Sequence, residues 1–257
     1  MVKYAMLLEY DGSHYVGYQV QPNGPSIQSK LEEALTIIAK LPKGQVIFTS
    51  ASGRTDSGVH ALGQVVHFDF PYRLPGNNFR KALNSILDPS IRIRQVVEVD
   101  QEFHARYSAI GKEYLYRVDL SDYPDPFKRL YTLHHPYSCR IDWMQEAIKA
   151  IIGQHDFTSF CSTKTDKTDL VRTIYNAEVL ELPDQQEIHF RFYGNGFLYN
   201  MVRILVGTLL QIGDGLKPVC ELDRLLEVKD RQQAGPTAAP QGLYMVRVAY
   251  PKNPFKD

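Results

Sequence analysis

The sequence predicts an α+β fold with a largely antiparallel sheet. Segments with the two-residue alternation of a half-buried strand are mixed with segments that have the helical spacing of apolar side chains, and the two kinds do not follow a regular β-α-β order. Strand-like segments also recur in neighbouring pairs, as they do in hairpins. A chain of 257 residues with 44% hydrophobic and 23% charged residues is long enough for one large or two small domains with a buried core.

The first half of the chain opens on a strand and a helix. Apolar side chains alternate over residues 2–10, which predicts a strand with one buried face. Ser26 is suited to cap a helix with apolar positions from Ile27 to Ile38, which Pro42 and Gly44 end. The further elements expected here are strands before and after residues 53–61, the first of them near the apolar run Val46–Phe48, a short helix over 77–87 and a strand over 91–99.

The pattern of residue types changes near residues 103–112, and we expect the chain to pass there from a first domain to a second. Tyr114, Tyr116 and Val118 share one face of the strand that follows. Asp142 is expected to cap a helix, with Gln145 completing a capping box. The remaining elements expected are strands over 172–182 and 187–193, a long amphipathic helix over about 197–212, a short helix over 221–227 and a final strand over 243–250.

Charge and cysteine content exclude several classes of protein. The chain has 29 basic and 29 acidic residues, so its formal net charge is zero, which argues against a nonspecific polyanion binder but allows a local basic surface for RNA. Three widely spaced cysteines suit neither a disulfide framework nor a zinc site, and reduced thiols in a cytoplasmic protein are the simplest account. The N-terminal segment does not have the pattern of a signal peptide, and no stretch approaches the roughly 20 apolar residues of a membrane span.

The most informative segment is residues 53–61, Gly-Arg-Thr-Asp-Ser-Gly-Val-His-Ala. It places Arg54 and Asp56 on a short turn between two apolar runs, where a scaffold of strands can fix the geometry of a reactive group. The same residues also suit an ordinary turn, because Asp bonds to its own backbone and Gly adopts positive φ. From these residues alone, both a structural turn and a reactive carboxylate remain open.

Two other segments present side chains that suit chemistry on a nucleic acid. One ring of the pair Tyr114 and Tyr116 is expected in the core, while the other could stack on a base, an interaction worth about 1–3 kcal/mol. Arg203, on the apolar helix, is either a residue at the edge of the core whose charged end reaches solvent or a partner that keeps a nearby carboxylate ionised.

Taken as whole strings, these segments resemble the TruA family of tRNA pseudouridine synthases. The similar segments are residues 53–61, Lys112–Tyr116 with its Lys-x-Tyr-x-Tyr pattern, and 197–203, Phe-Leu-Tyr-Asn-Met-Val-Arg. Residues 10–22, 153–160 and 234–244 also resemble family motifs, so the similarity extends from about residue 4 to 251. One departure is Tyr18, where the family usually has Trp, and a tyrosine can still pack or stack there.

The resemblance implies a fold and a reaction. It implies two similar α/β subdomains, residues 1–105 and 106–257, that form a continuous sheet flanked by helices with the active-site cleft between them. It implies isomerisation of uridine to pseudouridine at positions 38, 39 and 40 of the tRNA anticodon stem-loop, and a homodimer in which one tRNA spans both subunits. No redox partner or group donor is needed, so no cofactor is expected.

The resemblance also implies the roles of five residues. Asp56 acts on the ribose of a flipped-out uridine, either as a nucleophile at C1′ or as a base at C2′, and both routes require an ionised carboxylate. Arg203 pairs with Asp56, and Arg54 assists base flipping. Tyr114 stacks on the uracil, and Leu243 lies against the target base.

Two other function classes stay open on the residues alone. An RNA-binding module would use the same basic and aromatic surface without needing Asp56. A glycoside or nucleoside hydrolase would use an aspartate nucleophile, but that class usually needs a second carboxylate, which the Asp56 motif lacks. His60, His67 and His155 are not in a cluster with metal-ligand spacing, and no dinucleotide or phosphate-binding motif occurs, so no metal or nucleotide cofactor is expected.

Overall fold

The computed structural model describes residues 1–165 and 168–255, which divide into two compact units. Unit 1 consists of Met1–Ile110 together with the described residues from Met245 onward, and unit 2 of Gly111–Tyr244. The chain therefore enters unit 2 once and returns to unit 1 within its last strand. The predicted boundary after residue 105 lies just before this division, whereas the structure groups the end of the predicted second subdomain with unit 1.

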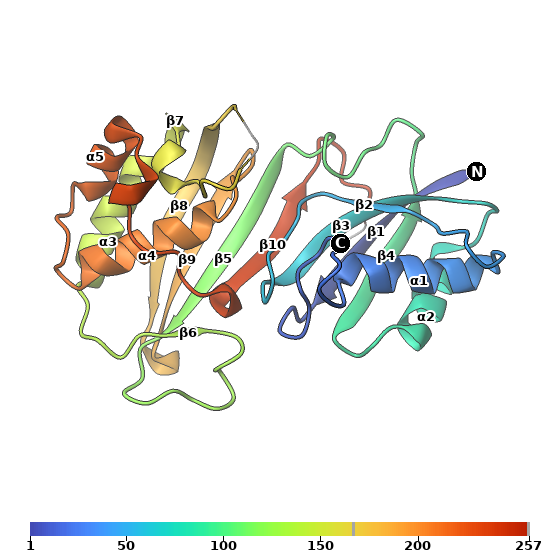
Figure 1. The fold of residues 1–257 in the computed structure, drawn as a ribbon, viewed down its shortest axis with the longest axis horizontal. Helices are drawn as coiled ribbons and strands as arrows, with labels where there is room; N and C mark the ends of the chain where they lie inside the picture. The colour runs from blue at the N-terminus through green and yellow to red at the C-terminus, as the bar shows by residue number, and fades with distance from the viewer. Residues whose placement is uncertain (166–167, 256–257) are drawn as a thin grey trace. The chain divides into compact units, whose positions relative to one another are not determined.

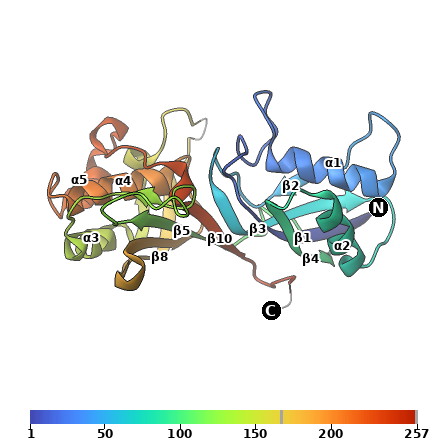
Figure 2. The ribbon, with the colours of Figure 1, turned by 90° about the horizontal axis from the view of Figure 1, so that it is seen from below.

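Unit 1 is an antiparallel sheet with two helices on one face (Figures 1 and 2). The central strand β1 pairs antiparallel with β3 on one side and with β4 on the other, and β3 also pairs with the short β2. The last strand, β10, is the next neighbour of β3. The elements of this unit are β1 (Val2–Tyr10), α1 (Ile27–Ala39), β2 (Thr49–Ala51), β3 (His60–Phe70), α2 (Gly76–Ile86), β4 (Ile91–Glu98) and, from Met245 onward, β10 (Leu243–Ala249).

Both faces of the unit 1 sheet are covered. On the helical face, Tyr4 of β1 packs edge-on against Phe79 of α2, with ring centroids 4.8 Å apart. The predicted cap of α1 is confirmed, because the Ser26 side chain accepts from the Ser29 amide and a capping box forms. On the opposite face, a second apolar cluster forms where the segments around Ala105 and Tyr250 cover the sheet, and the Tyr250 hydroxyl donates to the Ala105 carbonyl oxygen at 2.7 Å.

His67 of β3 is held neutral at the edge of this second cluster. Its Nδ1 accepts the Ala105 amide at 3.1 Å, and its ring lies 4.5 Å from that of His104. Burial, followed by the positive charges of His104 and Lys3, lowers the pKa of His67 to about 4. The imidazole is therefore neutral in the folded protein, and protonation of His67 at low pH destabilises the fold.

Unit 2 contains four antiparallel strands in the order β5-β9-β8-β7, with helices α3 and α4 packed on one face of them (Figures 1 and 2). The predicted common face of Tyr114, Tyr116 and Val118 on β5 is confirmed, because all three are buried. The main elements are β5 (Gly111–Asp119), β6 (Leu133–His134, parallel to β5), α3 (Ile141–Ala147), β7 (Gly153–Asp156), β8 (Val171–Leu182), β9 (Glu187–Gly194), α4 (Met201–Gly213) and α5 (Glu221–Val228).

The other face of this sheet carries a buried carboxylate. The Glu187 side chain, only 1% exposed, accepts two hydrogen bonds from Arg117 and one from His189, and it forms an ion pair with Lys128 at 3.1 Å. Burial alone would raise the pKa of this carboxyl, but the hydrogen bonds from its three cationic or polar partners outweigh it and lower the pKa to about 2. Glu187 therefore stays ionised in the folded protein.

The α+β class, with antiparallel sheets flanked by helices, is confirmed, and three local predictions need correction. The strand before the Asp56 turn is Thr49–Ala51, and Phe48 of the predicted apolar run is 77% exposed. Asp142 does not cap α3; Arg140 occupies the N-cap position and binds the Asp142 carboxylate instead. Helix α4 begins at Met201 rather than near residue 197. Within the described residues, none of the helices is both long and apolar enough to cross a membrane.

Candidate active site

The turn that contains Asp56 is held at both ends by the unit 1 sheet. Before the turn, β2 pairs with β3, and the Ser52 amide extends the pairing by donating to the Val65 carbonyl oxygen at 2.8 Å. Within the turn, the Val59 amide donates to the Asp56 carbonyl oxygen at 3.1 Å. Gly58 has a φ of 77°, a conformation that a side chain would strain. The sheet therefore fixes the position of the backbone on both sides of the Asp56 turn.

Burial along the turn separates anchoring residues from presented ones. Ser52 is fully buried and Thr55 is 7% exposed, whereas Arg54 is exposed and Asp56 is half-buried. The turn thus presents one guanidinium and one carboxylate, while Thr55 between them is packed inside. A carboxylate on a rigid support with partial access to solvent meets the positional requirement of a nucleophile or base.

The loop between β1 and α1 packs directly against this turn. The Tyr18 amide donates to the Thr55 carbonyl oxygen at 3.0 Å. A Cβ added to Gly12 would lie 2.0 Å from the Val59 carbonyl oxygen, and one added to Gly17 would lie 2.8 Å from that of Thr55. Only glycine allows the two backbones to approach this closely. The loop that resembled the first family motif is therefore a support for the turn, a role that its sequence did not reveal.

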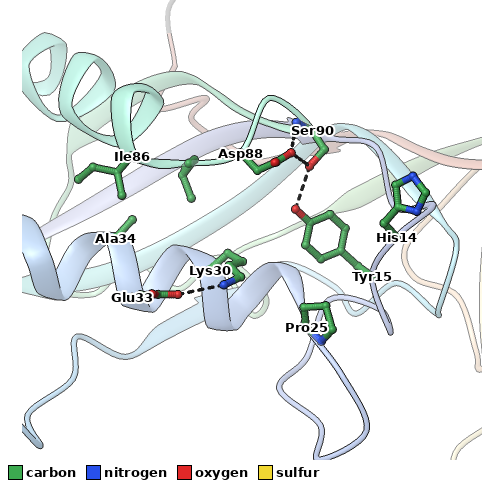
Figure 3. A pocket seen from close by; sticks show the side chains of 10 residues that line it. His14, Tyr15, Pro25, Lys30, Glu33, Ala34, Ile86, Asp88 and Ser90 are labelled. Atoms are coloured by element: carbon green, nitrogen blue, oxygen red, sulfur yellow. Dashed lines mark hydrogen bonds and ion pairs between the residues drawn. The ribbon is translucent and has the colours of Figure 1, made fainter.

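A groove of about 530 Å³ lies beside the same loop, bordered by His14, Lys30 of α1 and the segment before β4 (Figure 3). Tyr15 links the groove to the turn. Its hydroxyl is hydrogen-bonded to the Ser90 hydroxyl at 2.8 Å, and its carbonyl oxygen accepts from the Ser57 hydroxyl at 3.2 Å. The loop is thus tied to the start of β4 on one side and to the turn on the other.

The histidines near the turn have structural partners. His60, 2% exposed, accepts the Gly12 amide at Nδ1 at 3.1 Å, and the same nitrogen lies 3.2 Å from Asp11 Oδ1. Its proton is therefore on Nε2 when it accepts that bond. Searched over residues 1–165 and 168–255, the structure has no group of three or more His, Cys, Asp or Glu side chains placed to hold a metal ion.

In unit 2, the two tyrosines of β5 differ in exposure and in partners. Tyr116 is 0% exposed, and its hydroxyl donates to the Ala239 carbonyl oxygen at 2.6 Å. Tyr114 is 8% exposed, and its ring packs edge-on against Phe197 with centroids 4.9 Å apart. The prediction that one of the pair belongs to the core is met by Tyr116, since its hydroxyl is bonded inside the protein.

Arg203 is oriented by contacts within unit 2. Its Nε donates to the Ala238 carbonyl oxygen at 2.7 Å, and its Nη1 donates to Asn200 Oδ1 at 3.0 Å. The Ala238 amide in turn donates to the Arg203 carbonyl oxygen at 3.1 Å. Asn200 has a φ of 61° where it begins α4, so the residue that turns the chain into the helix also holds the guanidinium.

The segment 234–242 is pressed onto both α4 and β5 through glycines. A Cβ at Gly207 of α4 would lie 2.0 Å from the Pro236 carbonyl oxygen, and one at Gly242 would lie 2.7 Å from that of Arg117. A Cβ at Gly235 would lie 2.7 Å from the Cα of Thr208. Leu243, 6% exposed, follows directly and begins β10. One segment thus joins Arg203, Tyr116 and Leu243 in unit 2.

Comparison with known proteins identifies the family of this chain. A family model described as tRNA pseudouridine synthase matches residues 6–108 and 147–251. The chain belongs to the tRNA pseudouridine synthase family. The matched stretches contain Asp56, Arg203 and Leu243, while Tyr114 lies in the interval between them.

Curated relatives of this family are similar over nearly the whole chain. The tRNA pseudouridine synthase A of Lacticaseibacillus casei (strain BL23) is 52% identical over 97% of this chain and 100% of its own length. The protein of the same name from Geobacillus kaustophilus (strain HTA426) is 50% identical over 95% of this chain and 93% of its own. As a tRNA pseudouridine synthase, the protein is an isomerase that forms pseudouridine from uridine in tRNA.

Among solved structures, an H/ACA ribonucleoprotein bound to a substrate RNA containing 2′-deoxyuridine is similar over 80% of this chain and 44% of that chain. Its sequence identity is 17% and its TM-score is 0.33. A similarity at this level adds nothing to the family assignment, which rests on the family model and the curated relatives.

Proposed function

We propose that this tRNA pseudouridine synthase modifies uridines 38, 39 and 40 of the anticodon stem-loop, with Asp56 as the residue that acts on the ribose. The observation that supports Asp56 is its place in unit 1: a half-buried carboxylate on a turn whose neighbours are locked by the sheet and by the loop 11–18. The choice of these three uridines follows from the resemblance to the TruA family.

The reaction requires no reagent besides the protein and the tRNA. The C1′–N1 bond of uridine breaks, the uracil turns, a C1′–C5 bond forms, and the proton on C5 leaves, while N1 regains a proton. A carboxylate at Asp56 can attack C1′ or remove a proton from C2′, and each route needs the ionised form. Because a stacked base is inaccessible in the stem-loop, the target nucleotide must first be flipped out.

The remaining site residues have complementary roles in this proposal. Arg54, exposed two residues before Asp56, binds a backbone phosphate or occupies the space of the flipped base. Tyr114 stacks on the uracil, whereas Tyr116, which is 0% exposed, cannot reach a base. Leu243 lies against the base. Arg203, which Ala238 and Asn200 hold in place, keeps Asp56 ionised.

The resemblance to the family also extends to assembly and location. We propose a homodimer that binds one tRNA across both subunits, which sedimentation of the protein with and without tRNA tests through the mass of each complex. A cytoplasmic location is supported by the odd number and wide spacing of Cys139, Cys161 and Cys220, which suit reduced thiols in a reducing compartment.

The decisive experiment measures tritium release from tRNA labelled at uracil C5. The wild-type protein should release tritium without freeing uracil, and Asp56→Asn, which keeps the shape of the side chain, should release none. Asp69→Asn is the matched control, because Asp69 is an exposed aspartate on the strand that follows the turn. Full activity of Asp56→Asn would refute the role of Asp56, and free uracil among the products would indicate hydrolysis. Mapping the modified positions by sequencing tests the choice of uridines.

A further inference from the structure

We propose that Tyr10 and Gln64 are positioning residues for the reaction, acting through buried hydrogen bonds that fix the backbone on both sides of Arg54. The inference rests on the proposed role of Asp56 and adds two residues to which the family resemblance assigned no role. Both belong to strands of unit 1, and neither is exposed enough to contact a substrate: Tyr10 is 4% exposed and Gln64 is 0% exposed.

Gln64 is bonded to the start of the turn. Its Nε2 donates to the Gly53 carbonyl oxygen at 2.8 Å, and its Oε1 accepts from the Ser52 hydroxyl at 2.6 Å and from the Val65 amide at 3.2 Å. Gln64 thereby joins strand β3 to the two residues immediately before Arg54. An apolar side chain would pack in the strand as well but would leave the Gly53 carbonyl oxygen without this donor.

Tyr10 is bonded to the other side of Arg54. Its hydroxyl forms a hydrogen bond of 2.8 Å with the Thr55 hydroxyl and lies 3.5 Å from Gln64 Nε2. The Thr55 carbonyl oxygen is held separately by the Tyr18 amide. Residues 52, 53 and 55 are therefore each held by hydrogen bonds from buried side chains of the sheet, and Asp56 is the next residue in the chain. A displacement of about 1 Å at a reacting group can cost roughly 100-fold in rate, so this anchoring bears directly on turnover.

The cost of burying these groups indicates a role beyond packing. A buried hydroxyl or amide is unfavourable unless it is hydrogen-bonded. Besides their contact with each other and the bond from the Val65 amide, both side chains bond to residues of the turn. Burial raises the pKa of Tyr10 to about 12, so its phenol remains neutral at the pH of the reaction. Tyr10 thus acts by holding position and adds no charge beside Asp56.

The test is Tyr10→Phe, which removes one hydroxyl and keeps the buried ring. Tyr4→Phe is the matched control, because Tyr4 lies on the same face of β1, is 1% exposed, and bonds through its hydroxyl to the backbone of Leu74, away from the turn. We expect Tyr10→Phe to lower kcat about 10-fold or more with the Kd for tRNA changed less than about twofold. We expect Tyr4→Phe to lower the melting temperature similarly and to keep kcat. Equal effects of the two variants on kcat would overturn the proposal.

A second pair of variants keeps the proposal testable if Tyr10→Phe does not fold. Thr55→Ser retains the hydroxyl that Tyr10 bonds, and Thr55→Val removes it at almost the same volume. We expect Thr55→Ser to keep most of the wild-type kcat and Thr55→Val to lose about 10-fold or more; equal kcat values in both would overturn the proposal. Asp56→Asn separates the two levels of inference. If it is inactive while Tyr10→Phe is fully active, only the positioning role fails, whereas an active Asp56→Asn removes the proposed function itself.

Discussion

The close contact between α4 and the segment 234–242 leads to a prediction with a defined magnitude. In Gly207→Ala, the new Cβ would lie 2.0 Å from the Pro236 carbonyl oxygen, whereas an ordinary C···O contact is about 3.3 Å or longer. The segment must therefore move by more than about 1 Å. That movement would strain or break the two hydrogen bonds between Ala238 and Arg203, because Ala238 is only two residues after Pro236 in the same segment.

Overpacking costs typically 1–3 kcal/mol and each lost hydrogen bond about 1 kcal/mol, while alanine in a helix regains about 0.5–1 kcal/mol over glycine. We therefore expect Gly207→Ala to lower the free energy of unfolding by about 2–4 kcal/mol and to reduce kcat through the displaced Arg203. Urea unfolding and tritium release measure the two effects.

The control for this experiment is Gly213→Ala, at the last position of the same helix. Its Cβ would meet the Met144 side chain at 2.9 Å, and a flexible methionine can move aside. We expect this variant to lose less than about 1 kcal/mol of stability and to keep its activity. Equal stability and activity in Gly207→Ala and Gly213→Ala would refute the reasoning. The effect of the new Cβ would then not depend on whether it meets a backbone carbonyl oxygen or a flexible side chain.

Three further predictions concern charges. Arg203→Ala should lower kcat roughly 100-fold while the Kd for tRNA changes little, because its proposed partner is the Asp56 carboxylate and not the phosphate backbone; parallel losses of kcat and affinity would count against that pairing. Glu187, with its pKa lowered to about 2, contributes stability that is present above the unfolded carboxyl pKa and is lost as the pH falls from about 4.5 towards 2, so urea midpoints over this range should depend less on pH in Glu187→Gln. His67, with its pKa lowered to about 4, contributes stability that is present above about pH 6.5 and is lost towards pH 4, and His67→Gln should remove that part of the dependence; an unchanged slope would contradict it.

The sequence predicts elements well where one local pattern decides the structure. Strand β1 follows from alternation over residues 2–10, and helix α1 from an N-cap serine before an apolar stripe. It predicts less well where a competing interaction decides. Asp142 has the pattern of a capping residue, yet its carboxylate is bonded to Arg140, and the helix begins without a side-chain cap. Asn200 starts α4 because it adopts positive φ, which periodicity cannot indicate.

The site divides in the same way. The segments around Asp56 and Arg203 predict candidate reactive groups, because only a few residue types can perform the chemistry, and their roles stay a prediction. In the sequence, Tyr10 and Gln64 look like ordinary members of alternating strands, since their partners are the backbone carbonyl oxygen of Gly53 and the hydroxyls of Ser52 and Thr55. Contacts of that kind depend on the path of the chain in space, so a local sequence pattern does not predict them.

Both units support their proposed reactive groups by the same physical means. In unit 1, Gly12 and Gly17 let one loop approach the backbone of the Asp56 turn, and the buried hydroxyl of Tyr10 fixes that turn. In unit 2, Gly207 lets the segment 234–242 approach α4, and the buried hydroxyl of Tyr116 bonds the Ala239 carbonyl oxygen. In each unit a glycine permits the approach and a neutral phenol fixes it, so these two supports add no charge beside the proposed reactive groups. Substitutions at these buried positions should therefore reduce turnover without shifting the pH at which the reaction runs, because they move Asp56 or Arg203 and leave the charges around them unchanged.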